Sequence, residues 1–144
     1  MKKFTLIAGP CAIEDNEIGY EIAEKVKSIC DSLSIDYIFK ASYRKANRSK
    51  NNSFTGIGDN QALEIIKSIG EQFNLPTITD IHESNEPKKV ANYVTHLQIP
   101  AFLCRQTELL LEAGRSGLTV NIKKGQFMSH DAMGFAVEKV KSTG

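Results

Sequence analysis

Short apolar runs recur along this chain and predict its strands. The first run is closed by Gly9-Pro10, and the segment at the end of each of the five runs carries polar or charged groups. Runs of this length that are rich in apolar residues are typical of buried strands in a parallel sheet. The five runs are residues 4–8, 37–40, 77–79, 96–99 and 119–122.

The segments between these runs have the apolar spacing of amphipathic helices. The apolar positions of the first two are Ile22, Val26, Ile29 and Leu33, and then Leu63, Ile66, Ile69 and Phe73. Weaker helical patterns follow at residues 86–93, 107–115 and 131–141. We expect a turn at Gly58, with Asp59 or Asn60 capping the second helix.

Strand and helix therefore alternate five times, which predicts an α/β fold with a parallel sheet and right-handed crossovers. Five units suit an open doubly wound sheet, whereas a (β/α)8 TIM barrel takes about 250 residues. Residues 137–144 are predicted to end a helix where the next barrel strand would begin, so we expect truncation. The irregular stretch 42–58 is long, polar and basic, which is typical of a functional loop.

Composition narrows the class of protein. With 144 residues, 41% hydrophobic and 24% charged, the chain is predicted to be one globular domain. No apolar run approaches the roughly 18 residues of a membrane span, and Gly9-Pro10 comes too early for a signal peptide. We therefore expect a cytoplasmic protein without a membrane partner. The net charge of +1 argues against bulk nucleic-acid binding.

Charged residues gather where the predicted strands end. Five cations and no carboxylate lie within residues 40–50. Because strand ends of a parallel α/β fold share one rim, these cations predict an electropositive site for phosphate or carboxylate groups. The alternative is that each is an ordinary solvated surface charge. The charged residues of the rim are Lys40, Lys45, Arg48, Arg105 and Lys123, with Asp80 and Glu83.

The three cysteines are widely spaced, so they predict neither a disulfide framework nor a self-contained zinc site. Cys11 follows Gly-Pro, where a thiolate could bind a divalent metal or act as a nucleophile, but taken alone it is interpreted as a buried structural cysteine. Cys30 and Cys104 are interpreted as core. His82 is interpreted as a hydrogen-bonded supporting residue rather than a ligand or acid–base group.

The strand-end segments together resemble the metal-dependent 3-deoxy-D-manno-octulosonate 8-phosphate synthases. They read IAGPCAIE (7–14), FKASYRKANRS (39–49), TDIHE (79–83), QIPAFLCRQT (98–107) and VNIKKGQF (120–127). The related 3-deoxy-D-arabino-heptulosonate 7-phosphate synthases, our alternative, share GPC but have a second loop like KPRTS. The family fold is a TIM barrel, usually a homotetramer. The resemblance implies that residues 1–144 are the first five βα units of one barrel domain and that three units are absent.

The resemblance also implies a reaction and the residues for it. Phosphoenolpyruvate, D-arabinose 5-phosphate and water would give 3-deoxy-D-manno-octulosonate 8-phosphate, a lipopolysaccharide precursor, and phosphate. The residues implied for phosphoenolpyruvate are Lys40, Lys45, Lys123, Gln98 and Ala101. Those implied for arabinose 5-phosphate are Asn47, Arg48 and Ser49, with Ser42 and Asp80 nearby. Of these, Lys45, Asn47 and Lys123 would be catalytic.

Two further residues receive roles from the resemblance. Arg105 would lie near a neighbouring subunit's site. Cys11 would be one ligand of a divalent metal, with manganese, iron and zinc all open. A histidine and two carboxylates would complete the metal site from beyond Gly144. Arg44 departs from the family pattern, which more often has an acid there, and this puts the charge balance of its loop in question.

Three other functions stay open on the sequence. The chain could be an inactive fragment that only binds anions. Alone it is expected to have no synthase activity and to be poorly soluble, because its outer strands lack partners. It could be a nucleic-acid module acting through residues 40–50, although only Phe39, Tyr43 and Phe54 could stack on bases. It could be a Schiff-base aldolase that uses Lys123.

Overall fold

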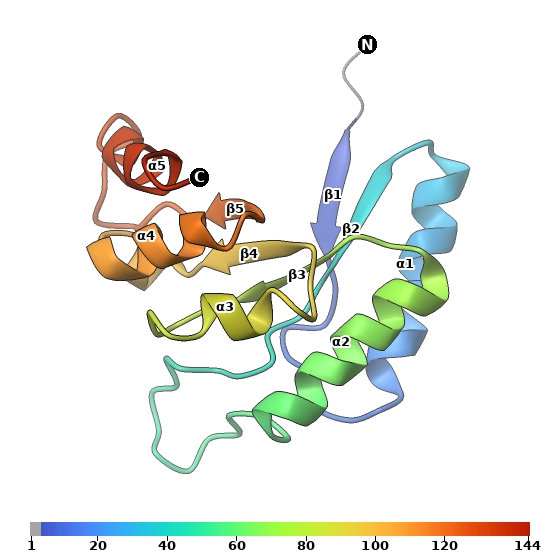
Figure 1. Ribbon diagram of the computed structural model, residues 1–144. Coiled ribbons are helices and arrows are strands. Elements are labelled where there is room, and N and C mark those ends of the chain that lie inside the picture. Colours follow the sequence, from blue (N-terminus) through green and yellow to red (C-terminus); the bar gives the residue numbers. More distant parts are fainter. Residues whose placement is uncertain (1–3) are drawn as a thin grey trace. The chain divides into compact units, whose positions relative to one another are not determined.

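The computed structural model describes residues 4–144, in which strands and helices alternate (Figure 1). These residues form two compact units, an N-terminal unit that ends at Thr79 and a C-terminal unit, Asp80–Gly144. The elements up to the junction are β1 (Thr5–Ala8), α1 (Ile18–Ser32), β2 (Asp36–Lys40), α2 (Asp59–Phe73) and β3 (Thr77–Asp80). The elements after it are α3 (Pro87–Val90), β4 (His96–Ile99), the 3-10 helix η1 (Ala101–Leu103), α4 (Thr107–Arg115), β5 (Thr119–Ile122) and α5 (Met133–Lys141).

The strands of each unit pair in parallel and in chain order. In the N-terminal unit β1 pairs with β2 from Thr5–Asp36 to Ala8–Phe39, and β2 pairs with β3. In the C-terminal unit β4 pairs with β5 from His96–Thr119 to Ile99–Ile122. A parallel strand followed by a helix is the repeating unit of the TIM barrel. The predicted fold class, α/β with the first five βα units of such a barrel, is confirmed, and each predicted strand is correct to within one residue.

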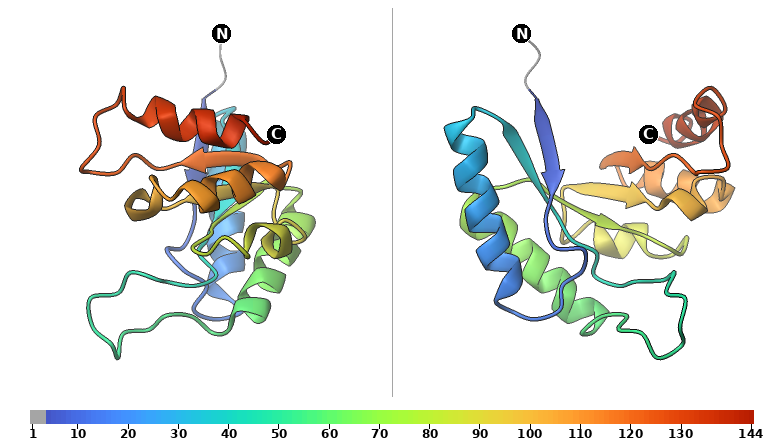
Figure 2. Two further views of the ribbon diagram at one scale, coloured as in Figure 1. Left: turned by 60° about the vertical axis from the view of Figure 1, so that its left-hand side comes forward. Right: turned by 180° about the vertical axis from the view of Figure 1, so that it is seen from behind.

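In the N-terminal unit, α1 and α2 lie side by side, drawn in blue and green in Figures 1 and 2. Leu63, Ile66 and Ile69 of α2 are buried as predicted. The predicted apolar face of α1 is wrong at its end, because Ile29 is 48% exposed and Leu33, which follows the helix, is 62% exposed.

Small side chains form the buried face of α1 instead. The buried residues of this helix are Gly19, Ala23 and Cys30. A Cβ on Gly19 would lie 3.0 Å from Cδ1 of Ile69. The helices therefore approach too closely for a large residue at position 19.

The predicted cap of α2 is also wrong. Gly58 precedes the helix, no side chain caps it, and Asp59 and Asn60 are already its first two residues. Asp59 instead binds Arg44, with 3.2 Å between Oδ2 and Nη1. The Asp59 carboxylate, which the local pattern predicted as a helix cap, therefore forms an ion pair with a residue fifteen positions earlier.

The C-terminal unit has its core between β4 and the helices that follow it. Leu97, Ile99, Leu110 and Ala113 are fully or almost fully buried. A Cβ on Gly114 would lie 2.4 Å from the Val140 carbonyl oxygen, so α4 and α5 are in close contact. Helix α4 has the predicted bounds, whereas α3 is shorter than residues 86–93 and α5 begins two residues later than predicted. Within residues 4–144, no helix combines the length and apolar character needed to cross a membrane.

Gly9 permits the close approach of β1 to the end of β2. A Cβ at this position would lie 2.1 Å from the Lys40 carbonyl oxygen. We expect Gly9→Ala to lower the free energy of unfolding of the complete protein by about 1–3 kcal/mol, the usual cost of overpacking. Gly134→Ala in α5 is the matched control, because a Cβ there has no atom within 4 Å and alanine favours helices. Equal denaturation midpoints for the two variants would contradict this account.

Candidate functional site

Four predicted site residues meet where β1 and β2 of the N-terminal unit end. Ala12 and Ser42 form an isolated parallel bridge, and the Ser42 amide donates to the Cys11 carbonyl oxygen at 3.4 Å. The segments after the two strands are therefore held together by their backbones. This arrangement brings Cys11 close to Lys40, Ser42 and Lys45.

Ser42 gathers two positive charges. Its side chain is fully buried, and its hydroxyl oxygen accepts hydrogen bonds from Lys40 Nζ at 2.9 Å and Lys45 Nζ at 3.0 Å. Two ammonium groups on one oxygen repel each other, so an anion that binds both is stabilised. The Lys40–Ser42–Lys45 cluster is therefore suited to a phosphate or carboxylate group.

The thiol of Cys11 lies beside this cluster. A hydrogen bond with Lys45 lowers its pKa, and the charges of Lys45, Lys40 and Arg48 lower the pKa further, against the opposing effect of partial burial. The side chain is exposed, so the interpretation of Cys11 as a buried structural cysteine is wrong. An exposed thiol with a lowered pKa is a competent metal ligand or nucleophile. Cys30 and Cys104 are buried, as predicted.

The loop after β2 presents the other predicted residues of this unit. Asn47, Arg48 and Ser49 are exposed in a segment without helix or strand, which Figure 2 shows as a long excursion before α2. Arg48 Nε donates to the Phe54 carbonyl oxygen at 3.1 Å, and the Lys45 amide donates to the Thr55 carbonyl oxygen at 2.8 Å. These two hydrogen bonds join the beginning of the loop to its end.

The positive charge of Arg44, the residue that departs from the family pattern, is stabilised by contacts within the N-terminal unit. Besides its ion pair with Asp59, its guanidinium lies 5.7 Å from the centroid of the Tyr43 ring. Both contacts stabilise a cation. The charge of Arg44 is therefore directed toward the start of α2.

In the C-terminal unit, polar side chains link the ends of β3, β4 and β5. Gln98 Nε2 donates to Asp80 Oδ1, and Asn121 Nδ2 donates to Gln98 Oε1 at 3.0 Å. Asp80 and Gln98 are buried. Asn121 was not predicted, although its polarity between Val120 and Ile122 in a strand is a signal that could have identified it.

The remaining predicted residues of this unit do not join that chain of hydrogen bonds. Ala101 begins η1, and Arg105 and Lys123 are exposed. The Lys123 amide donates to the Ile99 carbonyl oxygen at 3.0 Å, which continues the β4–β5 pairing past the strand end. His82 has a buried side chain whose Nδ1 lies 3.7 Å from Glu86 Oε2, and Oε2 also accepts from the His82 amide at 2.6 Å. This supports the interpretation of His82 as a structural partner.

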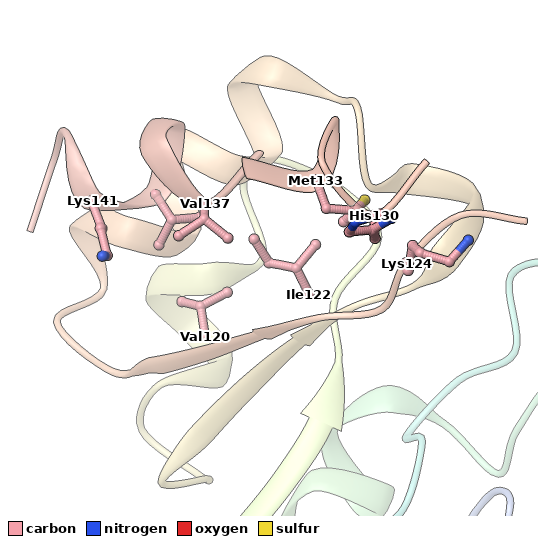
Figure 3. A pocket seen from close by; sticks show the side chains of 8 residues that line it. Val120, Ile122, Lys124, His130, Met133, Val137 and Lys141 are labelled. Carbon is pink, nitrogen blue, oxygen red and sulfur yellow. The ribbon is translucent and has the colours of Figure 1, made fainter. Parts of the chain in front are cut away.

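Arg105 and His82 both border a polar cavity of about 600 Å³. A second cavity, of about 360 Å³, lies between β5 and α5 (Figure 3). In this view Val120 and Ile122 point toward α5, which contributes Val137 and Met133, while Lys124 and Lys141 lie toward opposite ends. Its lining is mostly apolar and its lysines lie at opposite ends, so no pair of cations is brought together there as on Ser42. We therefore assign no substrate to the second cavity.

Comparison with known proteins identifies relatives over almost the whole chain. Three of these relatives come from Fusobacterium nucleatum, Koribacter versatilis and Campylobacter jejuni. Each is named 2-dehydro-3-deoxyphosphooctonate aldolase, which is another name for 3-deoxy-D-manno-octulosonate 8-phosphate synthase. Their identities are 53% over 128 residues, 45% over 142 and 46% over 143, which cover 89%, 99% and 99% of this chain. The alignments cover 46%, 51% and 53% of the relatives, so the chain spans about half their length.

These similarities confirm the resemblance seen in the strand-end segments. The sequence model of the DAHP synthetase I family matches residues 1–144. The match includes both units of the structure and every predicted site residue. This chain belongs to the DAHP synthetase I family.

Proposed function

We propose that the complete protein condenses phosphoenolpyruvate with D-arabinose 5-phosphate and water, giving 3-deoxy-D-manno-octulosonate 8-phosphate and inorganic phosphate. The observation that carries this proposal is the Lys40–Ser42–Lys45 cluster beside Cys11, in a chain whose relatives bear the octonate aldolase name. We place the reaction in lipopolysaccharide precursor synthesis in the cytoplasm, without a nucleic-acid or membrane partner.

The chemistry explains why fixed cations are needed. C3 of phosphoenolpyruvate attacks the sugar aldehyde, water adds at C2, and phosphate leaves, so charge develops beside groups that are already anionic. Lys40 and Lys45, held by Ser42, would bind phosphoenolpyruvate together with Lys123, and Gln98 and Ala101 would line its pocket. Cations positioned in advance stabilise such charge better than water, which must reorganise.

The second substrate would be held by the loop after β2. Asn47, Arg48 and Ser49 would bind arabinose 5-phosphate, with Ser42 and Asp80 contacting it nearby. Lys45 and Asn47 would act next to the reacting atoms. We also propose that the complete protein is a homotetramer, in which the exposed Arg105 would face a neighbouring subunit's site.

Cys11 fits a role as one ligand of a divalent metal, because the lowered pKa of its thiol favours the thiolate. Within the described residues, no three His, Cys, Asp or Glu side chains gather around a possible metal position. We propose that a histidine and two carboxylates outside residues 1–144 complete the site, and manganese, iron and zinc all suit these ligands. A bound metal would polarise the sugar aldehyde or orient the water.

The alternative substrate is distinguished by carbon count. A 3-deoxyheptulosonate product requires a four-carbon aldehyde, whereas an octulosonate requires a five-carbon one. Phosphate release from phosphoenolpyruvate by the complete protein should therefore be fast with arabinose 5-phosphate and negligible with erythrose 4-phosphate. The reverse preference would refute the proposal in favour of heptulosonate synthesis.

Arg48→Ala should raise KM for arabinose 5-phosphate by about tenfold or more and raise that for phosphoenolpyruvate much less, because a charged contact to the sugar phosphate is lost. Lys50→Ala, which removes another exposed cation of the same loop, is the control and should change neither constant. Steady-state kinetics with each substrate varied gives both values. A larger effect on phosphoenolpyruvate would show that the two phosphate sites are reversed.

A further inference from the structure

Three side chains form a directed chain of hydrogen bonds in the C-terminal unit. Register places Gln98 of β4 opposite Asn121 of β5, so their side chains lie on the same face of the strand pair. Asn121 Nδ2 donates to Gln98 Oε1 at 3.0 Å, and Gln98 Nε2 donates to Asp80 Oδ1. The backbone adds a further tie, since the Ile81 amide donates to the Gln98 carbonyl oxygen at 3.0 Å.

The direction of this chain follows from Asp80. Gln98 turns its amide nitrogen toward Asp80, which is the orientation in which a carboxylate oxygen accepts the hydrogen bond. The Gln98 oxygen then faces Asn121, which must in turn present its own nitrogen. Asp80 and Gln98 are buried, where a mismatched donor or acceptor costs far more than at the surface. Gln98 and Asn121 therefore each have one favoured amide orientation.

We propose that Asn121 is a positioning residue that locks the Gln98 amide and thereby holds the Asp80 carboxylate ready to accept a sugar hydroxyl group. The role rests on the proposed function, because it assigns Asp80 to the hydroxyl groups of arabinose 5-phosphate. A carboxylate accepts about four hydrogen bonds, so it can hold Gln98 and a hydroxyl group together. Asn121 itself acts only through Gln98.

Asn121→Asp is the sharpest test, because it keeps the shape of the side chain and reverses its polarity. The introduced carboxylate would face the Gln98 side-chain oxygen, and two acceptors repel each other. Gln98 would then either keep this repulsion or flip its amide, which turns its oxygen toward the Asp80 carboxylate. We expect the Kd for arabinose 5-phosphate to rise about tenfold, as for a lost hydrogen bond to a charged group. The Kd for phosphoenolpyruvate should rise about threefold at most, because its principal contacts are the lysines. Asn60→Asp makes the same change at an exposed position of α2 and should leave both values unchanged.

The double variant N121D/D80N tests, without any substrate, whether Asn121 fixes the orientation of the Gln98 amide. With an amide at position 80 and a carboxylate at position 121, a flipped Gln98 satisfies both neighbours, so the direction of the chain is reversed but complete. Asn121→Asp alone should lower the unfolding midpoint of the complete protein, and the double variant should restore it. Affinity for arabinose 5-phosphate should stay low, since the carboxylate at position 80 is gone.

Isothermal titration calorimetry and thermal unfolding separate the outcomes. Unchanged arabinose 5-phosphate affinity in N121D, when the wild-type protein binds this sugar, would overturn the inference and leave the proposed function standing. Equal weakening of both substrates would reduce Asn121 to a structural residue and overturn it too. A wild-type protein that binds neither substrate would overturn the proposed function and the role of Asn121 with it.

Discussion

Replacing Lys45 with methionine should weaken binding of phosphoenolpyruvate by about 2 kcal/mol or more, roughly a thirtyfold rise in Kd. The Lys45 ammonium group donates to the buried Ser42 hydroxyl, which also holds Lys40. Removing one of the two cations fixed on the same oxygen halves the positive charge of the Lys40–Ser42–Lys45 cluster, while methionine retains most of the side-chain volume. Lys123→Met should have an effect of similar size in the complete protein, because Lys123 is proposed as the third cation for the same substrate.

Titration calorimetry of the complete protein with phosphoenolpyruvate measures this effect. Lys25→Met, which removes an exposed cation of α1, is the control and should bind as the wild type does. The same Lys45 variant has a second readout, because the hydrogen bond with Lys45 is the largest cause of the lowered pKa of Cys11. The pH at which Cys11 reaches half its maximal alkylation rate should therefore move upward in Lys45→Met. An unchanged Kd with a shifted alkylation profile would show that Lys45 serves the thiol but not the substrate.

Cys11→Ser should abolish metal retention by the complete protein. Its thiolate is a soft, anionic ligand, and the nearby cations favour its deprotonation. A serine hydroxyl in the same place stays protonated at neutral pH, so the metal loses a charged ligand as well as a soft one. We expect metal analysis after gel filtration to fall from about one equivalent per chain to a small fraction, with activity lost in parallel.

Cys30→Ala provides the matched control for this experiment. Cys30 is buried in α1, so its replacement should lower stability slightly and leave the bound metal unchanged. A full equivalent of metal on the Cys11→Ser protein would refute the ligand role. Wild-type activity that survives exhaustive chelation would refute metal dependence altogether.

The amino-acid sequence by itself determined the architecture. Each βα unit is encoded locally, since a short apolar run, a turn and a helical apolar spacing each act over fewer than about 20 residues. The strands at residues 96–99 and 119–122 and the helix at 107–115 accordingly have the predicted bounds. The strand-end segments were also sufficient to place the chain in its family.

Local patterns failed where a distant contact decided the outcome. Asp59 was predicted as a cap, but Arg44, fifteen positions earlier, binds its carboxylate. The apolar spacing of α1 pointed to Ile29 and Leu33, whereas the close approach of α2 selected Gly19 and Ala23 for the buried face. In both cases the competing partner lies outside the helix, so the residue pattern of the helix itself does not reveal it.

Only the tertiary structure decided which polar groups act together. The sequence supplied Cys11, Lys40, Ser42 and Lys45 as separate candidates, and the β1–β2 register joined them around one buried hydroxyl group. It also supplied Asp80 and Gln98 without Asn121, because a hydrogen bond between neighbouring strands depends on register and leaves no periodic signal along the chain. The sequence thus determined which polar residues are available. The packing of the parallel strands determined the orientation of their side chains and their hydrogen-bond partners.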